Sequence, residues 1–131
     1  MGSRQGKIIV PAGVFPEKHE LETASYFAAQ GKDVEFQLPS RVKGVRTPDV
    51  QIEGVLFEMK CPFGKGRRTI QTCLQRASKQ SANIIMDLRH TPLKTEHCLS
   101  VLKREFKLRS NIKSLLIITK AETNNLIELN R

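Results

Sequence analysis

Two acidic residues and a lysine near the middle of the sequence have the types and spacing needed to hydrolyse a phosphodiester bond. Asp49 follows Pro48, and Glu58 and Lys60 stand two residues apart a little further along. Carboxylates hold Mg²⁺ together with water and phosphate oxygens, and the ion can activate a water molecule. A lysine beside it can orient that water or hold the anionic phosphate. These residues therefore predict metal-dependent hydrolysis.

The segment between them predicts a β-hairpin that brings the two carboxylates together. If Glu53-Gly54 is a two-residue turn, the strands pair Ile52 with Val55, Gln51 with Leu56, Val50 with Phe57 and Asp49 with Glu58. Lys60 falls on the same face, because strand side chains alternate with period two. Like charges opposite each other destabilise a sheet, so this arrangement needs a cation between them. A divalent metal ion meets that need better than Lys60 alone.

The alternative is an exposed hairpin with ordinary surface charges. Against it, apolar Leu56 shares one side of the second strand with Glu58 and Lys60, while the other side carries Val55, Phe57 and Met59. The charged side is therefore expected to be partly enclosed, and enclosed charges need partners.

The rest of the chain alternates between helical and strand-like patterns. Helices are expected over residues 17–30, 69–81 and 95–107, and strands over 7–10, 34–38, 49–52, 55–60, 83–88, 114–119 and 126–129. Gly31 suits the end of the first helix. We expect one α/β domain over residues 1–131, with a mixed central sheet and helices on its faces. Residues 1–13 are a lead-in, and Met1–Ser3 resemble a cloning remnant.

The charge balance favours a polyanionic partner. The chain has 22 Lys and Arg against 13 Asp and Glu, a net charge of +9, and binding of phosphates by such a surface releases counterions. Solubility, or an acidic protein partner, would also explain the charge. Two basic loops are candidates for contacts with nucleic-acid phosphates, and a solvated loop is the alternative for each: Arg41, Lys43 and Arg46, then Lys65, Arg67 and Arg68.

The cysteines and the apolar content exclude several classes of protein. Cys61, Cys73 and Cys98 form no CxxC pair and leave one thiol unmatched, which favours a reducing environment over a disulfide scaffold or a structural zinc site. No apolar run is long enough to cross a membrane, so no membrane insertion by this domain is expected.

Two other functions remain open. His19, His90 and His97 could serve as general acid and base in a metal-independent ribonuclease, although nothing in the sequence places two of them together. A non-catalytic module could bind nucleic acid through the basic loops. Aromatic residues are only 5% of the chain and there is no Trp, so base-stacking platforms are scarce. A binding module would also have no use for Asp49 facing Glu58.

Pro48-Asp49 followed by Glu58-Met59-Lys60 resembles the signature of the PD-(D/E)xK nuclease superfamily, which includes restriction enzymes and Holliday-junction resolvases. The resemblance implies a restriction-endonuclease-like core in which Asp49, Glu58 and a helical Glu20 hold Mg²⁺ or another divalent ion such as Mn²⁺. The carbonyl of Met59 is a further metal ligand on this reading, and Lys60 is the catalytic lysine. A helical Gln near the position of Gln80 supports the metal or the substrate in such enzymes, and Arg76 and Lys79 are weaker candidates nearby.

A longer part of the chain, about residues 14–89, resembles the C-terminal toxin domains of bacterial contact-dependent growth inhibition (CdiA) proteins that cleave tRNA. The residues that carry this resemblance are Phe15-Pro16-Glu17-Lys18-His19-Glu20, Pro39-Ser40-Arg41, Lys43 to Asp49, Glu58-Met59-Lys60 and Asn83 to Arg89. It implies a domain of a secreted or cell-surface toxin, delivered into the cytoplasm of a neighbouring cell. It also implies an acidic immunity protein as partner and leaves open a helper factor of the target cell. DNA is the alternative substrate, since most of the wider superfamily cleaves DNA.

Overall fold

The computed structural model describes residues 4–131, so Met1–Ser3 and their interpretation as a cloning remnant lie outside the described part. The chain divides into two compact units, of which the first ends at Phe57 and the second spans Glu58–Arg131. Hydrogen-bonded strands follow one another in chain order. The fourth of them, β4 (Val55–Lys60), is divided between the two units after Phe57.

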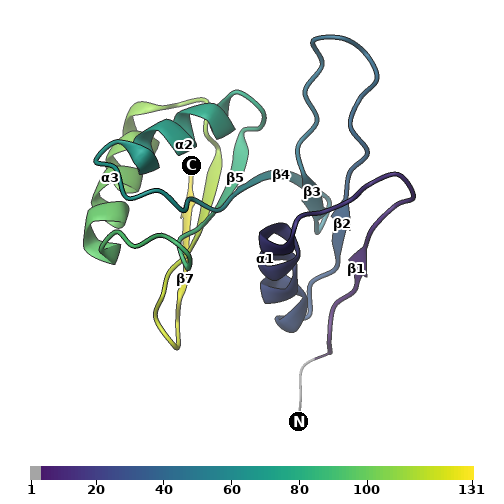
Figure 1. Ribbon diagram of the computed structural model, residues 1–131, viewed down its shortest axis with the longest axis horizontal. Coiled ribbons are helices and arrows are strands. Elements are labelled where there is room, and N and C mark those ends of the chain that lie inside the picture. Colours follow the sequence, from purple (N-terminus) through teal and green to yellow (C-terminus); the bar gives the residue numbers. More distant parts are fainter. Residues whose placement is uncertain (1–3) are drawn as a thin grey trace. The chain divides into compact units, whose positions relative to one another are not determined.

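The first unit contains one helix and short strands (Figure 1). Its elements are β1 (Ile8–Ile9), α1 (Lys18–Ala29), β2 (Val34–Phe36), β3 (Val50–Ile52) and the start of β4. β1 pairs with β2 in parallel, and the other pairs are antiparallel. α1 packs against β1 and β2. Burial of one strand face against the helix explains the alternating pattern that predicted these strands; the buried side chains include Ala24, Phe27, Val34, Phe36, Val50 and Ile52.

The predicted hairpin forms with the predicted register. Glu53 and Gly54 both have positive φ, 51° and 81°, as a two-residue turn of the type that matches the twist of the strands requires. The observed pairs are Ile52 with Val55, Gln51 with Leu56 and Val50 with Phe57. Asp49 precedes β3 instead of lying in it, but its carbonyl still accepts a 2.9 Å hydrogen bond from the N–H of Gln37.

The second unit contains two helices, which pack against each other, and a sheet of mostly parallel strands (Figure 1). Its elements after β4 are α2 (Thr69–Ser78), β5 (Asn83–Asp87), α3 (Thr95–Leu108), β6 (Ser114–Ile118) and β7 (Leu126–Asn130). β4, β5 and β6 pair in parallel, and β7 is antiparallel to β6. β5 and β6 are almost wholly buried, which is why their sequences are continuous apolar runs. Their core includes Ile70, Leu74, Ile84, Met86, Leu102, Leu115 and Ile117.

The mixed sheet with three helices in residues 4–131 confirms the predicted α/β fold class. Two predicted ends are wrong by two residues or more, and the others agree within one residue. Leu38 lies beyond β2 and is exposed. α2 stops at Ser78 and not at Ser81, because Lys79 and Gln80 donate to carbonyls three residues back. Such bonds tighten the last turn and end the helix before the chain enters β5.

Candidate active site

Glu20 and Asp49 line one cavity of the first unit. Glu20 lies in the first turn of α1 and Asp49 directly before β3, and both are half-buried. The cavity has a volume of about 210 Å³. Its remaining walls are formed by Gly13, Val14, Phe15, Pro16, Phe36, Gln37, Pro39, Thr47 and Pro48. The fold therefore brings together two of the four residues predicted for catalysis, from segments far apart in the sequence.

Local hydrogen bonds hold both of these residues in place. Oε1 of Glu20 accepts a 2.8 Å hydrogen bond from the N–H of Glu17, as part of the capping box that begins α1. The backbone of Asp49 is tied to Gln37, and Pro48 has a fixed φ. Both residues thus line the cavity from backbone positions with little freedom.

The donor set of this cavity suits a hard cation. Mg²⁺ binds one or two carboxylates and completes its shell with water and phosphate oxygens, whereas zinc prefers nitrogen and sulfur ligands. Within residues 4–131, no group of three or more His, Cys, Asp and Glu side chains is arranged to hold a metal ion. A metal ion at Glu20 and Asp49 would accordingly take most of its ligands from water, backbone or substrate oxygens.

Glu58 and Lys60 form an ion pair on β4 in the second unit. Lys60 Nζ lies 3.4 Å from Oε2 of Glu58, whose side chain is only 4% exposed, against 27% for Lys60. The two side chains lie on one side of the strand because they are two residues apart. Pairing of Glu58 with Ile84 and of Lys60 with Met86 fixes this end of β4 against β5. The predicted enclosure of these charges is therefore confirmed.

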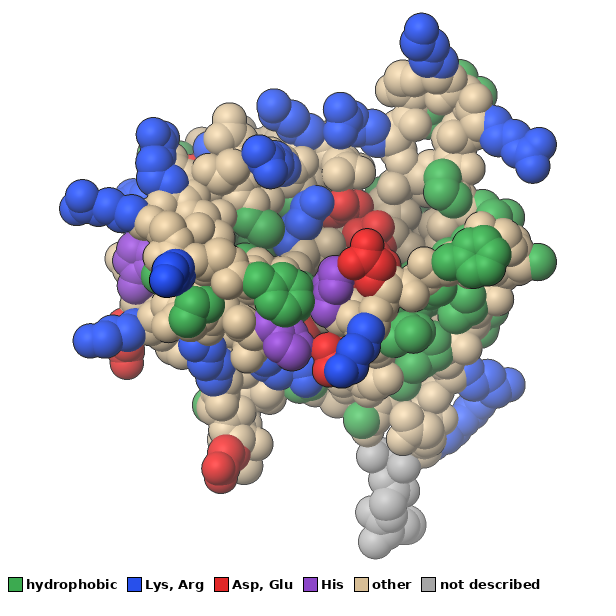
Figure 2. Space-filling model, viewed as in Figure 1, with side chains coloured by type: hydrophobic (Ala, Val, Ile, Leu, Met, Phe, Trp, Pro, Cys, Tyr) green, Lys and Arg blue, Asp and Glu red, His purple; other side chains and the backbone are tan. Residues whose placement is uncertain are grey.

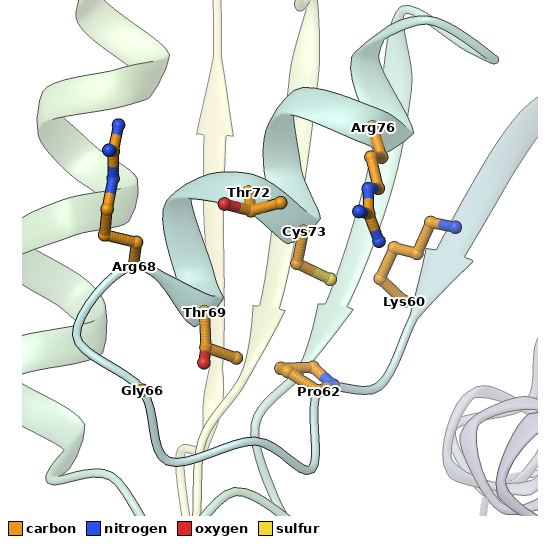
Figure 3. Close-up of a pocket in the computed structure, with 8 residues that line it drawn as sticks. All are labelled: Lys60, Pro62, Gly66, Arg68, Thr69, Thr72, Cys73 and Arg76. Atoms are coloured by element: carbon orange, nitrogen blue, oxygen red, sulfur yellow. The ribbon is translucent and has the colours of Figure 1, made fainter.

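Lys60 is also part of the wall of a basic cavity of about 510 Å³ (Figure 3). The loop from Pro62 to Arg68 and the first turns of α2 surround the opening, and no side chain caps the start of that helix. The cavity is lined by Lys60, Pro62, Gly66, Arg68, Thr69, Thr72, Cys73 and Arg76. Three of these side chains are cationic and none is acidic, so the cavity suits a phosphate group.

The charged residues of this cavity affect the pKa of the Cys73 thiol. Burial raises the pKa of Cys73 above its usual value; Lys60 and Arg76 lower it, and Glu58 raises it. Because burial outweighs the two cations, the thiol stays protonated at neutral pH. A protonated thiol is a weak nucleophile, so the chemistry of this cavity falls to Lys60 and the carboxylates and not to Cys73.

The predicted basic residues lie in exposed loops of both units. Arg41, Lys43 and Arg46 are exposed on the loop between β2 and β3, and Figure 2 shows Lys and Arg side chains at the tip of that loop and along the margin of the second unit. Lys65, Arg67 and Arg68 are exposed before α2. Of these six, only Arg68 is in the wall of the Lys60 cavity.

The residues predicted near the end of α2 have different surroundings. Arg76 lines the Lys60 cavity, which strengthens its candidacy. Lys79 is exposed, and half-buried Gln80 lies in the turn after the helix and outside the wall of that cavity. Met59 is buried and pairs with Ile85 of β5. Roles for Lys79, Gln80 and the Met59 carbonyl stay predictions.

Each of the three histidines has neighbours within its own unit. Nδ1 of His19 lies 3.5 Å from Oε2 of Glu17 in the first unit. The ring of His90 stacks on that of Phe63, with their centroids 5.2 Å apart. His97 lies on α3, in the wall of another cavity of the second unit. The histidine-based ribonuclease stays a hypothesis without a defined acid–base pair.

The sequence reasoning missed two features of the second unit. One is the cavity at His97, where Gln71, Ser100 and Arg104 join Arg67 and Arg68; the spacing of His97, Ser100 and Arg104 on one helix face was the available signal. The other is a bidentate pair, in which Arg89 donates to both carboxylate oxygens of buried Asp87 at 2.9 and 2.8 Å.

Comparison with known proteins finds a family whose model matches the chain. A model of the family described as "Contact-dependent growth inhibition CdiA C-terminal domain" matches residues 46–123, which include Asp49, Glu58 and Lys60. No curated protein matches the chain. In the described residues, no helix has the length and apolar character needed to span a membrane.

The fold also has a counterpart of known structure. A chain of the "CdiA-CT/CdiI toxin and immunity complex from Burkholderia pseudomallei" matches with a TM-score of 0.64 at 19% identity, over 96% of this chain and 100% of that one. At this identity the likeness concerns the fold. The family match, in contrast, covers more than half of the sequence. The chain belongs to the contact-dependent growth inhibition CdiA C-terminal domain family.

Proposed function

We propose that this chain is the nuclease domain of a contact-dependent growth inhibition toxin and that it cleaves tRNA with the help of a divalent metal ion. The observation that carries the proposal is the ion pair of Lys60 with buried Glu58 beside a cavity that has three cations in its wall. A buried carboxylate costs desolvation energy and needs a partner, and Lys60 supplies one at the edge of the cavity. Membership of the family supports the toxin role.

Asp49 and Glu58 act together in this proposal. The pairing of Asp49 with Glu58 stays a prediction from the sequence, one residue pair beyond the observed pair of Val50 and Phe57. Glu20, which shares the Asp49 cavity, would complete the acidic set of a PD-(D/E)xK core. These carboxylates, with the carbonyl of Met59, would hold Mg²⁺ or Mn²⁺. The bound ion supplies an activated water and offsets charge on the phosphate.

Lys60 has the role of the catalytic lysine. Its ammonium group, paired with Glu58, would donate to a phosphate oxygen or to the attacking water as negative charge develops. Arg68 and Arg76 hold the neighbouring phosphates of the strand, and Thr69 and Thr72 offer hydroxyl donors in the same wall. Gln80 and Lys79 extend this surface past α2.

The net charge of +9 and the basic loops favour a nucleic acid as substrate, and tRNA would be recognised largely by its shape and phosphates. The solved complex with a similar fold contains an immunity protein. We accordingly propose an acidic immunity protein as partner of this chain, delivery of the domain by a secreted or cell-surface protein, and action in the cytoplasm of the target cell. DNA cleavage by the same site is the second candidate, and a helper factor of the target cell is a third partner to test.

The test is incubation of the purified protein with total tRNA and with plasmid DNA, each in Mg²⁺ or in EDTA. We expect loss of tRNA only in Mg²⁺, and none with Lys60→Ala or Asp49→Ala. Lys113→Ala, which removes an exposed lysine outside the cavities above, is the matched control and should cleave normally. Cleavage of plasmid instead of tRNA would replace the proposed substrate by DNA. Cleavage that persists in EDTA and in Lys60→Ala would refute the proposed mechanism.

A further inference from the structure

A second basic cavity lies between α2 and α3, and Lys60 is not in its wall. It has a volume of about 470 Å³. Its polar lining consists of Arg67, Arg68, Gln71, His97, Ser100 and Arg104. Three arginines and no carboxylate face one enclosed space, and this concentrates positive potential there.

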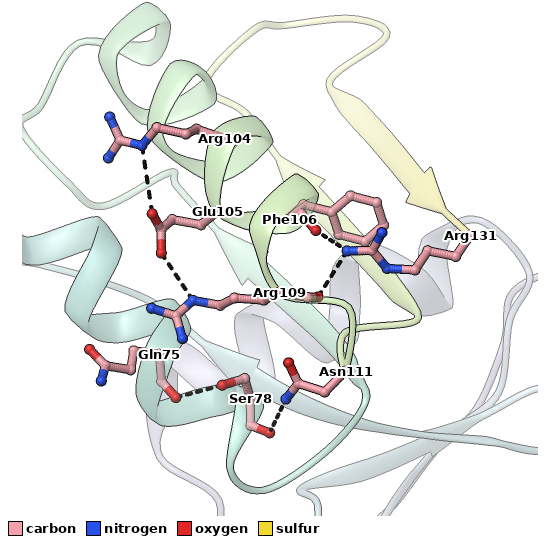
Figure 4. A network of polar contacts seen from close by, with 8 residues as sticks. All are labelled: Gln75, Ser78, Arg104, Glu105, Phe106, Arg109, Asn111 and Arg131. Atoms are coloured by element: carbon pink, nitrogen blue, oxygen red, sulfur yellow. Dashed lines mark hydrogen bonds and ion pairs between the residues drawn. The ribbon is translucent and has the colours of Figure 1, made fainter.

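Two of these arginines are not neutralised within the described chain. Neither Arg67 nor Arg68 makes an ion pair with an acid among residues 4–131. Arg104 is paired with Glu105, because its Nε lies 3.6 Å from Oε2 of that residue. The other oxygen of Glu105, Oε1, accepts a 2.9 Å hydrogen bond from Arg109. Figure 4 shows the terminal nitrogens of Arg104 directed away from Glu105. The ion pair therefore orients Arg104 and leaves its terminal donors available.

A histidine nitrogen in the same wall has no partner in the described residues. Nε2 of His97 is shielded from solvent and makes no hydrogen bond within residues 4–131. Buried polar atoms are nearly always satisfied, so this nitrogen is expected to bond a group from outside the chain, either a water molecule or a ligand. Together with the arginine donors, this nitrogen indicates a ligand rich in acceptor oxygens.

We infer that the cavity between α2 and α3 is a phosphate-binding subsite for the nucleic-acid strand, separate from the position of bond cleavage. This inference rests on the proposed nuclease function. Guanidinium groups match the oxygens of a phosphate in pairs, and His97, Gln71 and Ser100 add neutral or cationic donors. Arg68 lines both this cavity and that of Lys60. The subsite thus holds a phosphate next to the one at the cleavage cavity and sets the affinity and register of the strand.

Binding to tRNA in the Lys60→Ala background tests the inference without depending on cleavage. Arg104→Gln should weaken binding about tenfold and reduce the slope of log affinity against log salt by about one, as expected for one lost phosphate contact. Lys113→Gln is the control, because it removes an exposed charge of the second unit that does not line this cavity. It should change neither quantity. Equal effects of both variants, or none with Arg104→Gln, would overturn the subsite.

A second measurement separates this inference from the proposed function. Inorganic phosphate should shift the NMR signals of the His97 ring, and Arg104→Gln should abolish the shift. If the protein neither binds nor cleaves nucleic acid while phosphate still shifts His97, the nuclease proposal fails and the anion site stands. If Arg104→Gln weakens an immunity-protein complex and leaves tRNA affinity unchanged, the cavity is a protein-binding surface and the inference is wrong.

Discussion

Lys60 Nζ lies 3.4 Å from Oε2 of Glu58, which has one of the most buried carboxylates in the described chain. Both side chains project from one side of β4, whose end pairs with β5. Since a charge at low exposure must be compensated, the position of Lys60 is coupled to the stability of the second unit as well as to its chemistry.

Lys60→Ala should therefore destabilise the protein, and Glu58→Gln should relieve that cost. Removal of a cation beside a buried carboxylate is expected to lower the free energy of unfolding by about 1–3 kcal/mol at neutral pH. The double variant Glu58→Gln/Lys60→Ala should regain part of this loss, because the amide needs no counter-charge. Urea unfolding of the four proteins gives the coupling energy. Strictly additive effects would contradict a functional ion pair in solution.

The turn at Glu53-Gly54 can be tested with one substitution that should destabilise the hairpin and one that should stabilise it. Gly54 has φ of 81° and open space around it, so Gly54→Ala adds only backbone strain. We expect a loss of about 1 kcal/mol. Glu53→Asn should raise the free energy of unfolding by a few tenths of a kcal/mol, because Asn-Gly is the preferred pair for this turn. The exposed ion pair of Glu53 with Lys32, which this variant loses, contributes little. Thermal unfolding measures both changes; the opposite order would refute the turn assignment.

The rate at which the Cys73 thiol is alkylated should depend on the pH and on whether the Lys60 cavity is occupied. Its pKa is raised by burial, so alkylation by iodoacetamide should be slow at pH 7–8 and accelerate only above pH 9. The thiol also makes stability depend on pH. Its contribution to the free energy of unfolding is fully present below pH 9 and is lost as the pH rises through the raised pKa of Cys73. Lys60→Ala should slow alkylation further, and tRNA should protect the thiol.

Mass spectrometry distinguishes Cys73 from the half-buried Cys61 and buried Cys98. Alkylation of Cys73 at pH 8 as fast as a free thiol would contradict the raised pKa. Protection of Cys61 and Cys73 to equal degrees by tRNA would argue for general shielding and against binding in the Lys60 cavity.

The sequence predicted those parts of the fold whose signals are local. Glu53-Gly54 determines the turn, and the turn determines the register from Val50 to Phe57, so the hairpin could be derived residue by residue. The continuous apolar runs of β5 and β6 likewise indicated buried parallel strands. In contrast, the end of α2 depends on backbone hydrogen bonds that tighten its last turn. The periodicity of apolar residues does not predict these bonds.

The same distinction holds for the candidate sites. Glu58 and Lys60 could be predicted as a pair because they are two residues apart on one strand. The cavity at His97 could not, because it needs the packing of α2 against α3 to bring Arg67 and Arg104 into one wall. The Asp87–Arg89 pair was missed for another reason: Asp87 ends an apolar strand, and only its complete burial shows that the carboxylate requires a fixed partner.

That pair supplies the last prediction. Arg89 binds both oxygens of Asp87, whose side chain is 1% exposed, while the arginine is 32% exposed. Arg89→Ala should lower the free energy of unfolding by about 2–3 kcal/mol, somewhat less than the loss for a fully buried pair. Arg89→Lys should recover only part of this, because an ammonium group cannot make the two parallel bonds of a guanidinium. Urea unfolding measures both variants. If Arg89→Lys matches the parent protein, a point charge suffices and the bidentate geometry contributes nothing to stability.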